Sequence, residues 1–399
     1  MIKSAFKLSR TGFLFIAFSA FLGFQASYAQ TVVTSGYFQE LEPAWEQSGL
    51  KGMVFGFVAA SGQRYTQPFG RAIWSEEGEI TPDHIFRMAS MTKAITSVAA
   101  LQLVEQGLIG LDEPVGRYLP EIDQIPILRS NGHLVEARRP ITLRHLLTHT
   151  SGFGYSFMNE RLAGFEQPQD WPHRDLPRLT EAGNVWIYGT STDWAGRLVE
   201  KISGLSLEDY LRHYITGPLQ MHRTWFDVPD PLKSFIVSVG TRVAPDKPDF
   251  LESPQRIPLL PVVQFSGGGG LFSTMNDYLN FLECILNGGE LNGARILKEE
   301  TVMLMFEDQL PQLLGPERNP LDPTAGERRG QGLAWGIQTV DNDFGRQAGS
   351  AYWSGILNTY YSIDRNTGIA VVVMANYMPF LDNGILHLYK KFEAMVRTN

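Results

Sequence analysis

Cysteine is almost absent from this chain: its 399 residues include one, Cys284, so no intramolecular disulfide can form. Cys284 lies in an apolar stretch with a helical pattern, and we expect it to be a small core residue. Stability must then come from a hydrophobic core. A chain of this length, of which 43% is hydrophobic, can bury a large one.

Basic residues are also in deficit, with 34 Lys and Arg against 42 Asp and Glu, a formal charge of −8. Residues 1–29 differ from the rest: three basic residues precede an apolar run, Gly12 to Phe24, and small residues follow up to Ala29. We expect a secretory signal peptide cleaved after Ala29, which makes the protein secreted and, we expect, periplasmic. Loss of three basic residues changes the charge from −8 to −11, which disfavours binding to nucleic acid or an anionic membrane. The apolar run is too short for stable membrane insertion.

Several motifs of known chemistry are missing. No G-x-S-x-G occurs, which excludes the nucleophile elbow of α/β-hydrolases. The run Gly267–Gly270 lacks the lysine of a phosphate-binding loop, and Phe272 breaks the dinucleotide-binding pattern. We expect this run to allow close backbone packing before a helix that begins near Asn276.

Two histidines, His145 and His149, have the spacing of metal ligands on a helix, but Leu146 stands where a zinc protease has glutamate. The better interpretation is structural: Thr142 caps the helix and the histidines bond to nearby loops. No metal and no organic cofactor is predicted.

What is present is a serine and a lysine three residues apart, Ser90 and Lys93, at the start of a helical pattern. Met91, Ile95, Val98 and Leu101 have the spacing of a buried helix face, and Gly107 is placed to end the helix. On a helix Lys93 faces the Ser90 hydroxyl, and burial would lower the pKa of the lysine so that it accepts the serine's proton. Ser-x-x-Lys also begins at Ser4 and Ser48, but only the copy at Ser90 opens a long buried helix.

A tyrosine offers a second acid or base. Tyr188 stands between an aromatic-rich turn and a helix that runs to Gly204. A lone tyrosine is usually a core residue. Beside Ser90 and Lys93, however, a tyrosine hydroxyl can take the serine's proton and return it to the leaving group.

Strand patterns occur at both ends of the chain and helical patterns between them. Residues 53–59 and 63–69 predict a hairpin, and Gly332 to Val340, Asn358 to Ile363 and Ile369 to Met374 predict further strands before a closing helix from about Leu381 to Val396. We predict an α+β domain over residues 30–399. Its sheet lobe covers about 30–88 and 331–399, and a mostly helical lobe of about 89–330 is inserted between them.

These pieces, in this order, resemble the serine β-lactamase and penicillin-binding-protein superfamily. The similarity is closest to the branch that holds class C β-lactamases, D-alanyl peptidases and family VIII carboxylesterases, and it covers most of the chain from about Gly52 to Ala375. Besides Ser90-Met-Thr-Lys93 it includes Gly110-Leu-Asp-Glu-Pro-Val115, Leu143-Arg-His-Leu-Leu-Thr-His-Thr-Ser-Gly152, Gly268-Gly-Gly-Leu-Phe-Ser-Thr274 and Gly288-Gly-Glu-Leu-Asn-Gly293.

The resemblance implies roles for individual residues. Ser90 corresponds to the acylated serine, Lys93 to its partner and Tyr188 to the first residue of Tyr-x-Asn, whose Asn is replaced here by Thr190. The third family element, Lys-Thr-Gly, aligns with Trp353-Ser354-Gly355, which resembles the Trp-Gly-Gly of family VIII esterases. The backbone N–H groups of Ser90 and Ile356 would then form the oxyanion hole.

The altered motifs favour ester substrates. Trp353 replaces a cation that binds the carboxylate of β-lactams and D-alanyl peptides, and it supplies an apolar wall instead. We therefore expect a serine hydrolase that cleaves carboxylic esters through an acyl-enzyme, and the same site could pass the acyl group to an alcohol or amine. The alternatives are a β-lactamase or D-amino-acid peptidase, which would need another cation such as Arg346, and a penicillin-recognising binding protein without turnover. Residues 153–179 form either a lid or an ordinary surface loop, and the oligomeric state is open.

Overall fold

The two ends of the chain meet in one antiparallel sheet. The computed structural model describes residues 40–245, 247–258, 262–315 and 329–398, so the predicted signal peptide lies outside the described residues. The strand order is β11-β12-β13-β14-β15-β1-β2, and every neighbouring pair is antiparallel. The strands are β1 (Gly52–Ala59), β2 (Arg64–Gly70), β11 (Arg329–Gln331), β12 (Gly336–Gln338), β13 (Ala351–Gly355), β14 (Thr359–Asp364) and β15 (Ile369–Met374). This confirms the predicted α+β fold.

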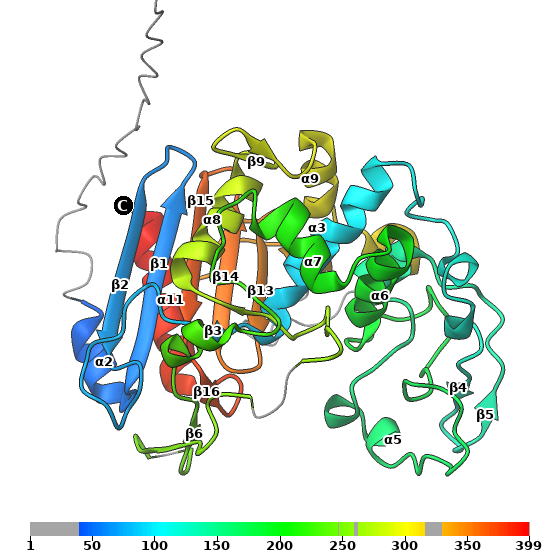
Figure 1. Ribbon diagram of the computed structural model, residues 1–399, viewed down its shortest axis with the longest axis horizontal. Coiled ribbons are helices and arrows are strands. Elements are labelled where there is room, and N and C mark those ends of the chain that lie inside the picture. Colours follow the sequence, from blue (N-terminus) through cyan, green and yellow to red (C-terminus); the bar gives the residue numbers. More distant parts are fainter. Residues whose placement is uncertain (1–39, 246, 259–261, 316–328, 399) are drawn as a thin grey trace, which may run out of the picture. The chain divides into compact units, whose positions relative to one another are not determined.

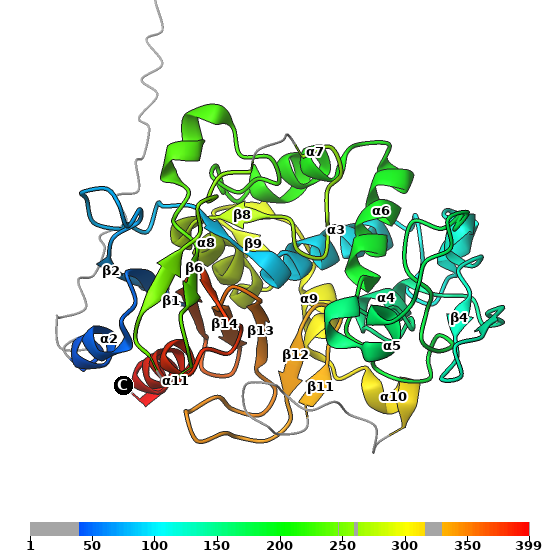
Figure 2. The ribbon, with the colours of Figure 1, turned by 90° about the horizontal axis from the view of Figure 1, so that it is seen from below.

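Successive side chains of a strand point to opposite faces of the sheet, and in this sheet both faces carry apolar side chains. Helices therefore cover both faces. Val54 and Val58 of β1 belong to the core that includes α8 (Met275–Leu286), whereas Met53, Phe55 and Phe57 pack in the core of α2 (Glu42–Ser48) and α11 (Asn383–Thr398). Figures 1 and 2 show α8 and α11 on opposite sides of the strands.

Helix α3 (Thr92–Glu105) forms the centre of the larger core. Thr92 to Leu103 are all buried, so the helix is enclosed on every side rather than on one face only. The predicted face of Met91, Ile95, Val98 and Leu101 is at most 1% exposed. Gly107 follows the helix with a φ of 70°, as predicted for a helix end.

The region between the sheet strands contains short helices joined by long loops. Its further α-helices are α4 (Leu143–Leu147), α5 (Glu160–Ala163), α6 (Ser191–Ser203), α7 (Leu207–Leu211), α9 (Glu299–Phe306) and α10 (Leu310–Leu314). Short 3-10 helices are η1 (Ala89–Met91), η2 (Val115–Arg117), η3 (Pro120–Ile122), η4 (Ser156–Met158) and η6 (Asp230–Phe235), and η5 (Arg212–Thr216) is a π-helix. Three small two-stranded sheets pair β3 (Phe86–Arg87) with β8 (Phe272–Ser273), β4 (Ile127–Leu128) with β5 (Leu134–Val135) and β9 (Glu290–Leu291) with β10 (Ala294–Arg295). A three-stranded sheet has the order β16 (Tyr377–Met378), β6 (Gly240–Arg242) and β7 (Phe250–Glu252).

The predicted strand from Gly332 to Val340 is wrong in its first half. The chain instead makes a tight turn in which the Gly332 N–H donates to the Trp335 carbonyl, and this turn joins β11 to β12. Glycine is required at 332 because a Cβ there would clash with the carbonyl oxygen of Met305. The second group of sheet strands thus begins at Arg329, two residues before residue 331, where this part of the sheet lobe was expected to begin.

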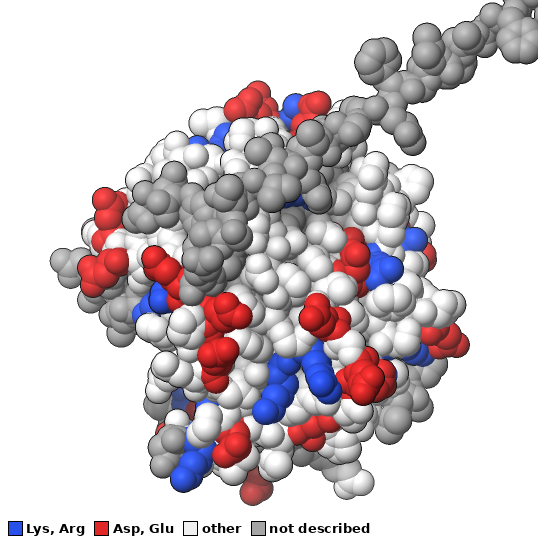
Figure 3. Space-filling view, turned by 90° about the vertical axis from the view of Figure 1, so that its left-hand side faces the viewer, with Lys and Arg blue, Asp and Glu red and all other residues white. Residues whose placement is uncertain are grey.

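Within the described ranges, none of the helices has both the length and the apolar character that crossing a bilayer requires. On the face seen in Figure 3, acidic and basic side chains lie interspersed, without a large area of one sign.

Candidate active site

Ser90 lies in a strained turn at the start of the central helix. Strand β3 leads into η1, where Ala89 has a φ of 45°, and α3 begins two residues after Ser90. A positive φ is unfavourable for a residue with a side chain and persists where the surrounding structure fixes it. The strain points to a functional constraint on the conformation that presents the Ser90 hydroxyl.

Lys93 is 1% exposed and meets the serine from the first turn of α3. Its Nζ donates to Ser90 Oγ at 3.2 Å, to the Tyr155 hydroxyl at 3.1 Å and to the Gly268 carbonyl at 2.5 Å. Burial favours the neutral amine, but the oxygens of Tyr188 and Tyr155 and the Asp193 carboxylate outweigh it and raise the pKa of Lys93. The expectation was that burial lowers the pKa of Lys93; in the structure the neighbouring groups outweigh burial, and the pKa is raised.

Tyr188 makes the shortest contact with the serine. It lies in the loop before α6, and its hydroxyl donates to Ser90 Oγ at 2.6 Å. The Lys93 ammonium lies 4.7 Å from the centre of the same ring, where a positive charge interacts favourably with the aromatic system. The structure thus brings together the three side chains that the sequence singled out.

A second tyrosine, which sequence reasoning missed, completes the lysine's surroundings. Tyr155 accepts from Lys93 and packs edge-on against Tyr188, with ring centroids 5.3 Å apart. Burial is the main reason that the pKa of Tyr155 is raised, so this hydroxyl keeps its proton. It belongs to the 153–179 segment, of which residues 156–158 are exposed. The segment therefore supplies a residue of the site. Tyr155 was missed because a single tyrosine in a loop belongs to no recognisable sequence pattern.

The tetraglycine run packs closely against neighbouring backbone and side chains, as predicted, and it also reaches Lys93. The Gly267 carbonyl accepts from Thr96 of α3, and the Gly268 N–H donates to the Asp193 carboxylate at 3.0 Å. A Cβ at Gly268 would clash with that carboxylate. The run lets the backbone fit between α3 and α6, so that Asp193 and the Gly268 carbonyl both stabilise the Lys93 charge.

The end of β13 lies beside the serine turn. A Cβ at Gly355 would lie 2.5 Å from the Met88 carbonyl oxygen, so only glycine allows this approach. Trp353, 7% exposed, contacts the Tyr188 ring at 5.5 Å, and Ser354 is half-buried. The Ile356 N–H donates to no hydrogen-bond acceptor among the described residues. It is therefore available to a substrate oxygen.

Thr190 lies two residues after Tyr188, at the N-cap of α6. Its side chain is half-buried and makes no capping hydrogen bond. It occupies the place of the family's asparagine, and its hydroxyl offers one donor and one acceptor where the amide would offer two donors and one acceptor.

The two motif histidines have structural partners. Thr142 caps α4, as predicted, and His145 completes a capping box with it. His149 is 2% exposed and stacks on Trp353 with centroids 5.9 Å apart. Burial and the charges of Lys93 and Arg329 hold the pKa of His149 well below its usual value, so the ring is neutral. Among the residues that the structure describes, no three His, Cys, Asp or Glu side chains are grouped to hold a metal ion.

Arg346 is not available to a substrate. It is fully buried, and its guanidinium donates to both oxygens of Glu393 at 3.1 and 2.9 Å and to the Tyr389 hydroxyl at 2.7 Å. Both partners belong to α11, on the sheet face opposite α3 and α8. The suggestion that Arg346 replaces the missing lysine is therefore wrong.

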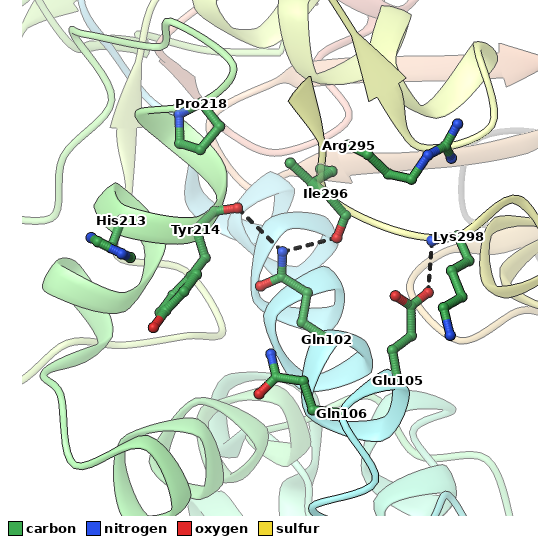
Figure 4. Close-up of a pocket in the computed structure, with 9 residues that line it drawn as sticks. All are labelled: Gln102, Glu105, Gln106, His213, Tyr214, Pro218, Arg295, Ile296 and Lys298. Carbon is green, nitrogen blue, oxygen red and sulfur yellow. Dashed lines mark hydrogen bonds between the residues drawn. The ribbon is translucent and has the colours of Figure 1, made fainter. Parts of the chain in front are cut away.

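A cavity of about 380 Å³ lies near the far end of α3 (Figure 4). Gln102 crosses its wall and donates to the carbonyls of Tyr214 and Ile296. No serine is among the described residues that line it. Because α3 has 14 residues and rises about 1.5 Å per residue, this cavity lies roughly 20 Å from the Ser90 end.

The fold and the site together define a class of protein. A serine at the start of a buried helix, hydrogen-bonded to a lysine and a tyrosine beside the end of strand β13 of an antiparallel sheet, is equipped for acyl transfer through a serine ester. The chain belongs to the beta-lactamase family, which its sequence matches over residues 38–394.

Relatives and solved structures place it among acyl-transfer enzymes. Monacolin J acid methylbutanoyltransferase from Aspergillus terreus is 30% identical over 372 residues, 83% of this chain and 87% of the relative. Lovastatin esterase from Penicillium rubens is 30% identical over 356 residues, 78% and 86% of the two chains. Unliganded simvastatin synthase from Aspergillus terreus has a TM-score of 0.81 and 28% identity over 92% of this chain and 99% of that chain.

These relatives confirm the family resemblance and the predicted fold. They include acyltransferases and an esterase, which act on small-molecule acyl substrates and support serine-type acyl transfer in this chain as well.

Proposed function

We propose that this protein is an exported serine enzyme that cleaves carboxylic esters through an acyl-enzyme on Ser90. The observation that carries the proposal is the hydrogen bonding of one hydroxyl. Ser90 Oγ is contacted by the Tyr188 hydroxyl at 2.6 Å and by the Lys93 ammonium at 3.2 Å.

Each of these groups has its own part in acylation. In the reacting form Tyr188 has first released its own hydroxyl proton to water; Ser90 Oγ then attacks the ester carbonyl carbon, and its proton passes to the Tyr188 oxygen. The Lys93 ammonium stabilises the negative charge on that oxygen. The backbone N–H groups of Ser90 and Ile356 hold the oxyanion of the tetrahedral intermediate. When the intermediate collapses, the C–O bond to the alcohol breaks, and Tyr188 returns the proton to the leaving oxygen.

The second half of the reaction needs an acceptor. Water loses a proton to Tyr188, attacks the Ser90 ester and releases the acid, and Ser90 recovers its proton. An alcohol in the same position accepts the acyl group by the same steps. Acyl transfer to an alcohol is therefore the second candidate function, and it is favoured by the methylbutanoyltransferase among the relatives.

The site favours an ester over a β-lactam. Trp353 provides an apolar ring where the related enzymes have a lysine, Thr190 lacks the amide of asparagine, and Arg346 faces α11. An ester with an apolar acyl group needs none of the three missing contacts.

Hydrolysis of p-nitrophenyl acetate, butyrate and octanoate and of a chromogenic cephalosporin tests the proposal. We expect the esters to be cleaved faster than the cephalosporin, and Ser90→Ala to abolish both activities. Ser48→Ala is the matched control, because Ser48 also precedes a lysine by three residues but only bonds within its own turn. Faster cleavage of the cephalosporin would contradict the ester assignment, and an ester product formed with added alcohol would identify the transferase.

A further inference from the structure

Arg329, the first residue of β11, is a buried cation at the edge of the active site. Its side chain is 5% exposed. The centre of its guanidinium lies 4.5 Å from the Trp353 ring centroid and 4.7 Å from that of Trp186. These cation–π contacts stabilise the charge but use none of the N–H donors of the guanidinium.

Within the described residues, this arginine has no counter-charge. No described carboxylate forms an ion pair with it, and its Nε is buried without a hydrogen-bond partner. Two other buried arginines are paired: Arg346 with Glu393 at 2.9 Å and Arg397 with Asp364 at 3.1 Å. A buried charge without a partner is costly, so its presence beside a reaction site points to a ligand that pairs with it.

The position of Arg329 connects it to the nucleophile through two rings. Trp186 stacks on Tyr188 with centroids 6.1 Å apart, and Trp353 contacts the same tyrosine at 5.5 Å. Tyr188 in turn bonds to Ser90 Oγ. Two other titratable groups beside this wall, His149 and Lys93, carry no negative charge, and the Asp193 carboxylate acts on Lys93. The Arg329 guanidinium adds a second cation beside Trp353 and Trp186.

The backbone leaves room for this side chain. A Cβ at Gly336 of β12 would lie 2.9 Å from Nη1 of Arg329, so glycine allows the guanidinium to lie across the neighbouring strand. The planar guanidinium can still present paired N–H donors to a carboxylate, in the bidentate geometry that arginine favours.

We propose that Arg329 binds a carboxylate of the substrate, so that the preferred ester carries a negative charge on its acyl or its alcohol part. This inference rests on the proposed acyl-transfer function of Ser90.

Two matched pairs of esters test it. Mono-p-nitrophenyl glutarate and p-nitrophenyl pentanoate differ by a carboxylate on the acyl part, and 4-acetoxybenzoate and 4-acetoxybenzamide differ on the leaving part. We expect the wild type to favour the charged ester in one pair. We also expect Arg329→Gln to lower the charged-to-neutral ratio of kcat/KM at least about tenfold, since it removes hydrogen bonds to a charged group. Arg329→Lys should restore part of that ratio.

Arg212→Gln is the control, because Arg212 stacks on Trp225 at 3.5 Å but touches none of the site residues. Its ratio should equal that of the wild type. The proposal is overturned if Arg329→Gln leaves the ratio unchanged in both pairs, or if it lowers both members of a pair equally, which is the result of a purely structural role.

If Arg329→Gln does not fold, inhibition of wild type and Arg329→Lys by glutarate against butyrate decides the matter. A wild-type preference for glutarate that the lysine variant weakens supports the proposal, and equal inhibition refutes it. If the wild type cleaves no ester of either pair, the acyl-transfer proposal fails. Calorimetric binding of glutarate to the two proteins then tests Arg329 on its own.

Discussion

Two tyrosines meet the lysine of this site from different loops, and they differ in what they touch. The Tyr188 hydroxyl donates to Ser90 Oγ, and the Tyr188 ring lies beside the Lys93 ammonium. The Tyr155 hydroxyl instead accepts from Lys93, and its ring packs against the Tyr188 ring. Only Tyr188 is placed to exchange a proton with the reacting oxygen. Tyr155 is a positioning residue that holds the ammonium in place.

We predict that Tyr188→Phe lowers kcat on a neutral ester by about 10²- to 10⁴-fold, the usual contribution of a general acid–base group. Tyr155→Phe removes one hydrogen bond to a charged group and should lower kcat only about tenfold. Steady-state kinetics of both variants, with circular dichroism as a check of folding, measure this. A larger loss in Tyr155→Phe would reverse the two roles.

Residue identities were predicted unevenly from the sequence. Ser90, Lys93 and Tyr188 lie in recognisable motifs, so they could be named. The direction of the Lys93 pKa shift could not be predicted, because it depends on Tyr155 and Asp193, which come from distant segments of the chain. Arg346 was wrongly considered a substrate cation, since sequence proximity to Trp353 does not show which face of the sheet a side chain occupies.

At the scale of elements, the backbone of the tetraglycine run lies between α3 and α6 and determines how closely the two helices pack. Gly268 is the critical position, because its N–H donates to Asp193 and its carbonyl accepts from Lys93. A shift of this backbone therefore weakens both contacts.

We predict that Gly268→Ala lowers kcat/KM at least about tenfold and the free energy of unfolding by about 1–3 kcal/mol, the usual cost of overpacking. Gly110→Ala is the control, since the nearest atom to its added Cβ is 3.7 Å away. It should change stability by less than about 0.5 kcal/mol. Urea denaturation and ester kinetics measure both effects, and wild-type behaviour of Gly268→Ala would refute the packing argument.

Elements with strong local patterns were predicted well, and those fixed by tertiary contacts were not. The apolar spacing in α3 and the β1–β2 hairpin, with its Ala60-Ser61-Gly62 turn, carry their own signals. The turn between β11 and β12 was missed, because Gly332 is required there only by the close approach of the Met305 carbonyl, which belongs to another element. Sequence periodicity contains no information about such a contact.

At the scale of the whole molecule, a buried charge network joins the C-terminal helix to the sheet. Glu393 of α11 accepts from Arg346 and Arg397 and from Ser362 of β14, and its side chain is fully buried. Burial alone would raise the pKa of Glu393, but the two arginines outweigh it and lower that pKa.

We predict that Glu393→Gln lowers the free energy of unfolding by about 3–5 kcal/mol, because it removes the carboxylate that pairs with the buried Arg346 and leaves Arg397 with Asp364 alone. Glu299→Gln, which breaks an exposed pair with Arg365 at 3.6 Å, should cost less than about 1 kcal/mol. Since the folded pKa of Glu393 is lowered to about 2, its contribution is fully present above the unfolded pKa of about 4.3 and is lost progressively as the pH falls from there through the folded pKa. The difference in unfolding free energy between wild type and Glu393→Gln should therefore be constant above about pH 5 and shrink as the pH falls towards about 2, and a constant difference over that whole range would contradict this assignment.

The prediction of export rests on residues 1–29, the expected signal peptide. We expect a bacterial host that expresses the full-length gene to release a protein whose first residue is Gln30, after cleavage behind Ala29. Mass spectrometry of the periplasmic fraction and of the cytosol would show this. An uncleaved chain in the cytosol would refute the export proposal without affecting the proposed chemistry at Ser90.

The most direct test of the central claim is to look for the acyl group on Ser90. Wild type and Ser90→Ala are mixed with p-nitrophenyl butyrate in a stopped-flow instrument, and samples quenched in acid are digested for mass spectrometry. We predict one butyryl group per wild-type chain, on the peptide that contains Ser90, and none in Ser90→Ala, which also releases no p-nitrophenol above background. Undiminished p-nitrophenol release by Ser90→Ala, or a butyryl group on a different residue, would contradict the account.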